Sequence, residues 1–175
     1  MKKLFLIMFA IVFAQSAIAQ EVALGPIAGY FKASDADEGS IIFGGAIRLK
    51  LADALGVEGS IGYRKEEYLD GDLKVTSYPI MVTGMLYALP MVYGAIGAGW
   101  YNFNIDYAGS LGIADETTQE FGYHLGGGVE LPLGNLILRG DIRYVFLNLK
   151  LDNMPNAKDI KSDFYVITAG VLFNL

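Results

Sequence analysis

The chain has 175 residues, no cysteine, and 13 lysine and arginine residues against 19 aspartate and glutamate residues. This length suits one domain, the acidic balance argues against a nucleic-acid partner, and the absence of cysteine excludes disulfides and cysteine-ligated zinc. The sequence is 53% hydrophobic with a mean hydropathy of +0.38, yet beyond the N-terminus no apolar run is long enough for a transmembrane helix. This combination suggests membrane strands, in which only every second residue meets lipid.

The first predicted element is a cleavable signal peptide over residues 1–19. Two lysines precede an apolar run over residues 4–14, and small residues at Ala17 and Ala19 provide a cleavage site. The alternative is a membrane-anchoring helix, but the apolar run is shorter than the roughly 20 residues that a spanning helix needs. We therefore predict export of the chain and a barrel domain over residues 20–175.

Eight segments are predicted to form β-strands, and most of them alternate between apolar and polar residues. In chain order they cover residues 22–31, 41–51, 57–66, 73–87, 91–107, 120–131, 136–146 and 165–173. The first and fourth are less regular, because both faces are apolar in places and a proline interrupts each strand. In the fifth and seventh segments we expect the apolar face, with Tyr101, Phe103, Ile142 and Tyr144, to point outward to lipid.

The connections between these segments alternate in length. Short turns are predicted at residues 52–55, 88–90 and 133–135, and longer polar loops at residues 33–40, 108–118 and 151–162. Short turns at one end and long loops at the other are typical of an up-and-down transmembrane barrel. The connection at residues 70–72 is short although it belongs to the long set, which predicts a tight tip on the second hairpin.

The last segment, YVITAGVLF, has an aromatic residue at its end and an apolar face made of Tyr165, Ile167, Ala169, Val171 and Phe173. It resembles the C-terminal signature of outer-membrane β-barrels, although Asn174 and Leu175 follow the aromatic residue. The segment FGYHLGGGVELPLGNLILRGDIRYVFLNL likewise resembles the penultimate hairpin of small porin-like and OmpA/OmpX-like barrels. Together these resemblances cover residues 21–173.

The resemblance implies an all-β fold: an eight-stranded antiparallel up-and-down transmembrane β-barrel, preceded by a signal peptide. It implies residence in the outer membrane of a diderm bacterium, among outer-membrane lipids and lipopolysaccharide. It also implies that the barrel-assembly machinery reads the last strand during biogenesis.

The polar faces of the strands predict a charged network in the lumen of the barrel. Its candidate members are Arg48, Lys50, Glu58, Arg64, Glu66, Asp106, Glu120, His124, Glu130, Arg139, Asp141 and Arg143. Buried ions need partners, and eight strands leave just enough room for side chains. We therefore expect a structural polar core, with a gated ion path as the alternative. The turn at residues 133–135 should place Glu130 across from Arg139, or one diagonal step from it.

Three further patterns have competing interpretations. The glycines at residues 94–99 and 126–128 lack the helix that a phosphate-binding loop needs, so we interpret them as relief of crowding in a narrow barrel. His124 is the only histidine, but a lipid A deacylase of the outer membrane has a serine two residues after its histidine, where this chain has Gly126. We therefore favour a structural histidine. Acidic loop residues are interpreted as solvated, with divalent-cation bridges to lipopolysaccharide phosphates as the alternative; they are Asp35, Asp37, Glu38, Asp115 and Glu116.

No catalytic, cofactor-binding or metal site is predicted. We expect a non-enzymatic integral outer-membrane barrel with a structural or surface-interaction role and a largely plugged lumen. The alternative is a narrow porin-like channel for ions or small solutes. A lipid-modifying enzyme is a distant third, because the sequence offers no nucleophile, base and orienting group together.

Overall fold

A computed structural model describes residues 21–33, 39–68, 73–107, 116–149, 160–161 and 163–175. Its strands are β1 (Glu21–Ala33), β2 (Ser40–Ala52), β3 (Leu55–Tyr68), β4 (Leu73–Leu89), β5 (Val92–Tyr107), β6 (Glu116–Leu133), β7 (Leu136–Leu149), β8 (Ile160–Lys161) and β9 (Phe164–Asn174). Among these described residues, no helix is long and apolar enough to cross a membrane. The predicted signal peptide and the acidic loop residues Asp35, Asp37, Glu38 and Asp115 lie outside the described part of the chain, whereas Glu116 is the first residue of β6.

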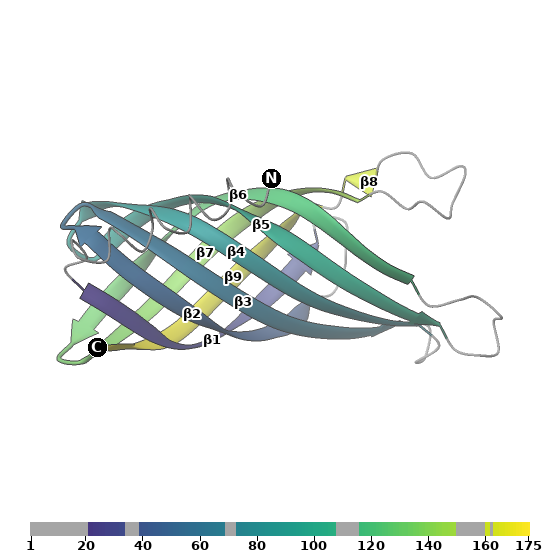
Figure 1. Cartoon of the computed structure of the whole chain (residues 1–175), viewed down its shortest axis with the longest axis horizontal. Coiled ribbons are helices and arrows are strands. Elements are labelled where there is room, and N and C mark those ends of the chain that lie inside the picture. Colours follow the sequence, from purple (N-terminus) through teal and green to yellow (C-terminus); the bar gives the residue numbers. More distant parts are fainter. Residues whose placement is uncertain (1–20, 34–38, 69–72, 108–115, 150–159, 162) are drawn as a thin grey trace, which may run out of the picture.

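Eight of these strands close into one antiparallel barrel (Figure 1). Consecutive strands pair from β1 to β7, then β7 pairs with β9, and β9 pairs back with β1. The two-residue strand β8 adds to the end of β7. The predicted eight-stranded up-and-down topology is confirmed.

The short turns lie at residues 53–54, 90–91 and 134–135, at the same end of the barrel as the C-terminus (Figure 1). Gly134 has a φ of 63°, in the left-handed region that favours glycine. The predicted turn at residues 88–90 is displaced, because β4 continues to Leu89 before the chain reverses. The predicted longer loops and the tight tip at residues 70–72 fall mostly outside the described residues.

Side chains alternate between the lumen and the outer surface, as the two-residue period requires. In β7, Arg139, Asp141 and Arg143 are buried, whereas Leu138 and Ile142, at the alternate positions, are exposed. The predicted faces of β2, β3, β6, β7 and β9 are confirmed in the same way by the exposure of their apolar residues and the burial of the opposite face.

The prediction for β5 was wrong: Tyr101 and Phe103 point into the lumen and are only 2% and 8% exposed. The outer face of this strand instead carries Val92, Ile96 and Trp100. Both faces of β5 are apolar over much of its length, so alternation alone does not identify the outer one. Register identifies it, because Trp100 lies between Ile80 of β4 and Phe121 of β6, whose side chains are exposed.

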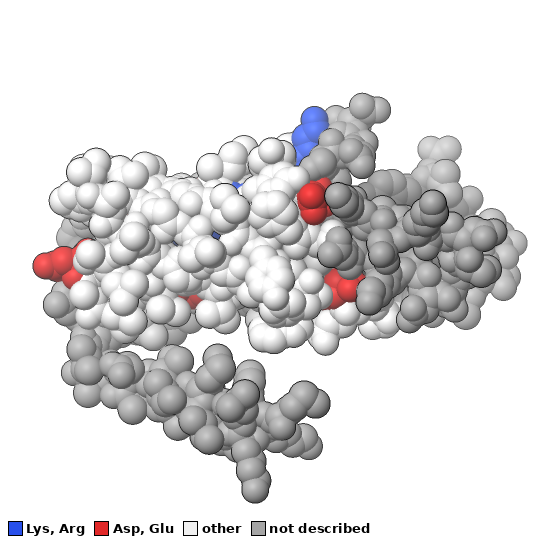
Figure 2. Space-filling view, turned by 90° about the horizontal axis from the view of Figure 1, so that it is seen from above, with Lys and Arg blue, Asp and Glu red and all other residues white. Residues whose placement is uncertain are grey.

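Each barrel strand contributes an exposed aromatic side chain at a similar distance from the turn end. We call this set the aromatic belt: Tyr30, Phe43, Tyr63, Tyr78, Trp100, Tyr123, Phe146 and Tyr165. Its members lie roughly ten residues from the turns, which on strands tilted by about 40° gives a height of roughly 25 Å. The surface between the belt and the turns is largely aliphatic, and Figure 2 shows a broad, nearly uncharged middle band on the described barrel. This band matches the apolar thickness that a membrane barrel presents to lipid.

Candidate functional site

The lumen is filled by side chains in successive layers. Near the turns, Tyr87 and Tyr93 pack with Met85 and Ala95. The middle layer, which we call the ionic layer, contains the buried charged residues Arg48, Glu58, Glu130, Arg139, Asp141 and Arg143. On the loop side of it lies an apolar cluster of Ile42, Met81, Tyr101, Phe103, Val145, Leu147, Phe164 and Val166. The polar faces of the sequence predicted the ionic layer, but the apolar cluster was not predicted.

Glu58 lies at the centre of the ionic layer and is fully buried. Its Oε2 accepts from Arg48 Nη2 and from Arg139 Nη1, each at 2.7 Å, and its Oε1 accepts from Arg143 Nη2 at 2.7 Å. Arg48 is on the neighbouring strand β2. Arg139 and Arg143 are on β7, which is separated from β3 by three strands in either direction around the ring. Glu58 therefore connects opposite walls of the barrel.

A second ion pair, between Arg48 and Glu130, also crosses the lumen. Their strands, β2 and β6, are again on opposite sides of the ring. Glu130 also accepts a hydrogen bond from the Tyr87 hydroxyl at 3.1 Å. Glu130 is the register partner of Arg139, as predicted. Register alone would favour an ion pair between these two residues, but the long Arg48 side chain reaches Glu130 across the lumen while Arg139 turns to Glu58 and Asp141.

Asp141 completes the ionic layer on β7. It pairs with Arg139 and with Arg143, the latter at 3.1 Å. Its oxygens also accept from the hydroxyls of Tyr93 at 3.1 Å and Thr168 at 3.0 Å. The layer thus sets three guanidinium groups against three carboxylates, all buried. Such balance is what a low-dielectric interior needs if it is to hold ions.

His124 lies at the boundary between the ionic layer and the apolar cluster. Its Nε2 is 2.9 Å from Thr83 Oγ1, which also accepts from Arg143 Nη1 at 2.9 Å. When the single Thr83 proton points to Nε2, the imidazole proton is on Nδ1, where the structure describes no partner. Gly97 faces the ring, and a Cβ there would lie 2.6 Å from Nε2. These contacts support a structural role for His124, whose ring is held between Thr83 and Gly97. They also support the interpretation of Gly97 as relief of crowding.

The other predicted members lie at the edges of the layer or beyond it. The Arg64 guanidinium stacks over the Phe31 ring at 3.6 Å on the loop side, and Lys50 Nζ is 5.4 Å from the Tyr87 ring at the turn side. Glu120 is half-buried. The side chains of Glu66 and Asp106 are outside the description. Among the described residues, no group of three histidine, cysteine, aspartate or glutamate side chains could hold a metal ion.

Four uncharged members of the layer were not predicted: Thr83, Tyr87, Tyr93 and Thr168. Residue type alone does not assign the two tyrosines to the lumen, where their hydroxyls bind carboxylates. A usable signal for Thr83 was hairpin register, since pairing β3 with β4 puts it directly opposite Glu58.

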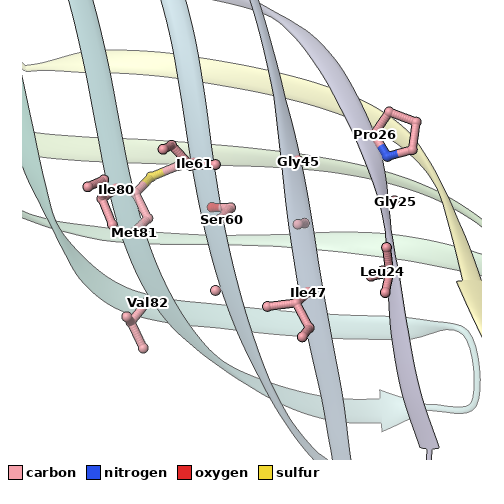
Figure 3. Close-up of a pocket in the computed structure, with 12 residues that line it drawn as sticks. Leu24, Gly25, Pro26, Gly45, Ile47, Ser60, Ile61, Ile80, Met81 and Val82 are labelled. Carbon is pink, nitrogen blue, oxygen red and sulfur yellow. The ribbon is translucent and has the colours of Figure 1, made fainter. Parts of the chain in front are cut away.

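Two cavities described in the lumen are small. One of about 20 Å³ lies among Phe31, Arg64, Tyr101 and neighbouring apolar residues, and another of about 10 Å³ lies at the turn side beside Arg48 and Glu130. A much larger depression, about 730 Å³, is on the outer surface across β1 to β4 (Figure 3). It is lined by apolar side chains, glycines and Ser60, and belongs to the band that faces lipid.

The comparisons agree with this architecture. A family model described as "Outer membrane protein beta-barrel domain" matches residues 4–173. No curated protein sequence matches the chain.

Solved structures share the fold, among them the following three. A major outer membrane protein from Thermus thermophilus has a TM-score of 0.65 at 14% identity, covering 89% of this chain and 98% of that one. Neisserial surface protein A has a TM-score of 0.57 at 19% identity, covering 88% and 97%. The attachment invasion locus protein Ail of Yersinia pestis has a TM-score of 0.54 at 16% identity, covering 89% and 97%. With its closed eight-stranded barrel and a family match over almost its whole length, this chain belongs to the outer-membrane β-barrel proteins and resides in the outer membrane.

Proposed function

We propose that this protein is a non-enzymatic barrel with a structural or surface-interaction role, and that its lumen is closed to ions. The observation that carries the proposal is the position of Glu58, which holds guanidinium groups from opposite walls at 2.7 Å. A permeating ion would have to break charge-assisted hydrogen bonds that are buried on all sides. The same hydrogen bonds therefore both hold the walls of the barrel together and obstruct its lumen.

The apolar cluster on the loop side supports the same proposal. An ion entering from that side would leave water among side chains such as Phe103, Leu147 and Phe164 before reaching the ionic layer. Taking an ion out of water without a partner costs several kcal/mol. Two barriers of different chemistry therefore lie in series along the lumen.

The surface-interaction part of the proposal concerns lipid, lipopolysaccharide and the assembly machinery. The last strand presents Tyr165, Ile167 and Phe173 on the outer surface, where an assembly factor would meet them. Ail, a protein of the same fold, is named for attachment and invasion and has been crystallised with the heparin analogue sucrose octasulfate. This precedent supports a surface role for a barrel of this size.

Planar-bilayer recording of the refolded protein tests the closed lumen. We expect the wild type to show little steady conductance and Glu58→Ala to show more, because that change removes a carboxylate shared by three guanidinium groups and opens space. Asp53→Asn, at an exposed site in the turn between β2 and β3, is the matched control and should behave as the wild type. A large steady conductance in the wild type would refute the closed lumen and favour a narrow porin-like channel.

A further inference from the structure

On one side of the barrel, the sheet continues well past the aromatic belt. Strand β5 runs on from Trp100 to Tyr107, and β6 begins at Glu116, ahead of Phe121. On the other side, β9 begins at Phe164, directly before the belt residue Tyr165. Figure 1 shows β3 to β6 as long ribbons that reach beyond the end of β9. A wall of β-sheet thus rises above the lipid-facing band.

The outer face of this wall carries uncharged polar side chains on three neighbouring strands. We call them the polar ledge: Thr76, Asn102, Asn104, Thr117 and Gln119. Each lies two or four residues along its strand from the exposed Tyr78, Trp100 or Phe121. Because alternate residues of a strand share a face, the ledge residues lie on the outer face. Register places Thr76, Asn104 and Thr117 in one row, and Tyr78, Asn102 and Gln119 in the next.

Hydrogen bonds hold the two amides of the ledge in position. Gln119 Nε2 donates to Asn102 Oδ1 at 2.5 Å, and Asn102 Nδ2 donates to the Tyr78 carbonyl oxygen at 3.1 Å. Each amide group still has further donor or acceptor capacity, because an amide has two N–H groups and two oxygen lone pairs. The ledge therefore presents pre-oriented donors and acceptors.

Aromatic rings lie directly beside these amides. The Trp100 and Phe121 rings meet edge to face with centroids 5.5 Å apart, and both are exposed, as is Tyr78. Lys65, the register partner of Thr76, borders the ledge. The side chains of the ledge are themselves uncharged, and aromatic surface lies beside them.

Sugars match this chemistry. A sugar hydroxyl both donates and accepts, as do amide and threonine side chains, and the C–H face of a sugar ring stacks on an aromatic ring. A bare phosphate would instead call for a cluster of arginine or lysine. The ledge adjoins the aromatic belt, which marks the membrane interface in outer-membrane barrels. Lipid headgroups lie at that level.

We propose that the polar ledge binds the core saccharide of a glycolipid in the surrounding outer leaflet, with lipopolysaccharide as the source of the sugar. This inference deepens the surface-interaction role proposed above and rests on it. It does not depend on whether the lumen conducts. The hydrocarbon chains of the same lipid would lie along the aliphatic band below.

Trp100 is the only tryptophan in the chain, so its fluorescence reports directly on the ledge. The refolded protein in phospholipid nanodiscs is titrated with lipopolysaccharide that carries its core saccharide, and separately with lipid A, which has the same anchor without the core. We expect lipopolysaccharide to bind more tightly. Asn102→Ala and Gln119→Ala should each weaken its binding roughly fivefold, as expected for one lost hydrogen bond, and should leave the lipid A affinity unchanged.

Asn135→Ala, at an exposed turn at the opposite end of the barrel, is the control and should bind both lipids as the wild type does. Heat-resistant migration in gels verifies that every variant is folded. Equal affinity of the wild type for the two lipids would overturn the proposal, as would ledge variants that bind lipopolysaccharide normally. Free core oligosaccharide that competes at the same concentration as the intact lipid would also overturn it, because the ledge would then serve a soluble glycan. Bilayer conductance separately tests the closed lumen.

Discussion

Glu58 and Arg143 meet across the full width of the barrel. Arg143 Nη2 donates to Glu58 Oε1 over 2.7 Å, although their strands, β3 and β7, stand on opposite sides of the ring. Arg139 reaches the other oxygen of the same carboxylate at 2.7 Å. The centre of the lumen is therefore an ionic connection between walls, and this arrangement leads to specific expectations for stability.

Removal of the Glu58 charge should be strongly destabilising. Glu58→Gln leaves three buried guanidinium groups with one carboxylate fewer, and breaking a buried pair from one side costs about 3–5 kcal/mol. Urea unfolding in lipid vesicles measures the loss. Asp53→Asn, in the exposed turn between β2 and β3, should unfold as the wild type does, and equal midpoints for the two variants would contradict a central role for Glu58.

Double-mutant cycles should identify Arg48, and not the register neighbour Arg139, as the charged partner of Glu130. We expect Glu130→Ala and Arg48→Ala to be non-additive, because the double variant leaves no orphan charge from their pair. The cycle of Glu130→Ala with Arg139→Ala should show a smaller coupling free energy. A larger coupling in that second cycle would show that hairpin register, and not reach across the lumen, determines the pairing.

A charge on the lipid-facing side of β7 should be costly. Ile142 is 49% exposed on the outer face, and arginine near the bilayer midplane costs about 2–4 kcal/mol. Ile142→Arg should unfold in vesicles at lower denaturant concentration than the wild type, whereas Ile142→Leu should not. A harmless Ile142→Arg would mean that this face does not meet lipid.

On β5, the inward residue should matter more than its outward neighbour. Phe103→Ala removes a ring from the apolar cluster in the lumen and should cost about 3–5 kcal/mol. Trp100→Phe keeps an aromatic ring on the belt and should change the free energy of unfolding by much less. The opposite order would restore the assignment of Phe103 to the lipid face.

Export should remove the first 19 residues, because their apolar run fits a signal peptide and has no place in a strand-built barrel. Mass spectrometry of the protein from envelope material should find a chain that begins at Gln20. Detection of the intact Met1 terminus there would support the membrane-anchor alternative.

The sequence by itself determined the architecture, because a two-residue period and alternating turn lengths are local properties. Glu58, Arg139, Asp141 and Arg143 could be assigned to the lumen in this way, since each lies opposite a clearly apolar face. Local pattern was also sufficient for the outward face of β9, with Tyr165, Ile167 and Phe173.

Only the tertiary structure decided which groups meet. The partner of Glu130 depends on closure of the barrel, which brings β2 opposite β6 and lets a long arginine side chain reach past its hairpin neighbour. The orientation of β5 likewise depends on its register with β4 and β6, because both of its faces are apolar. By residue type, Tyr87 and Tyr93 could face either lipid or the lumen. They face the lumen because their hydroxyls donate to the carboxylates of Glu130 and Asp141 inside the closed barrel.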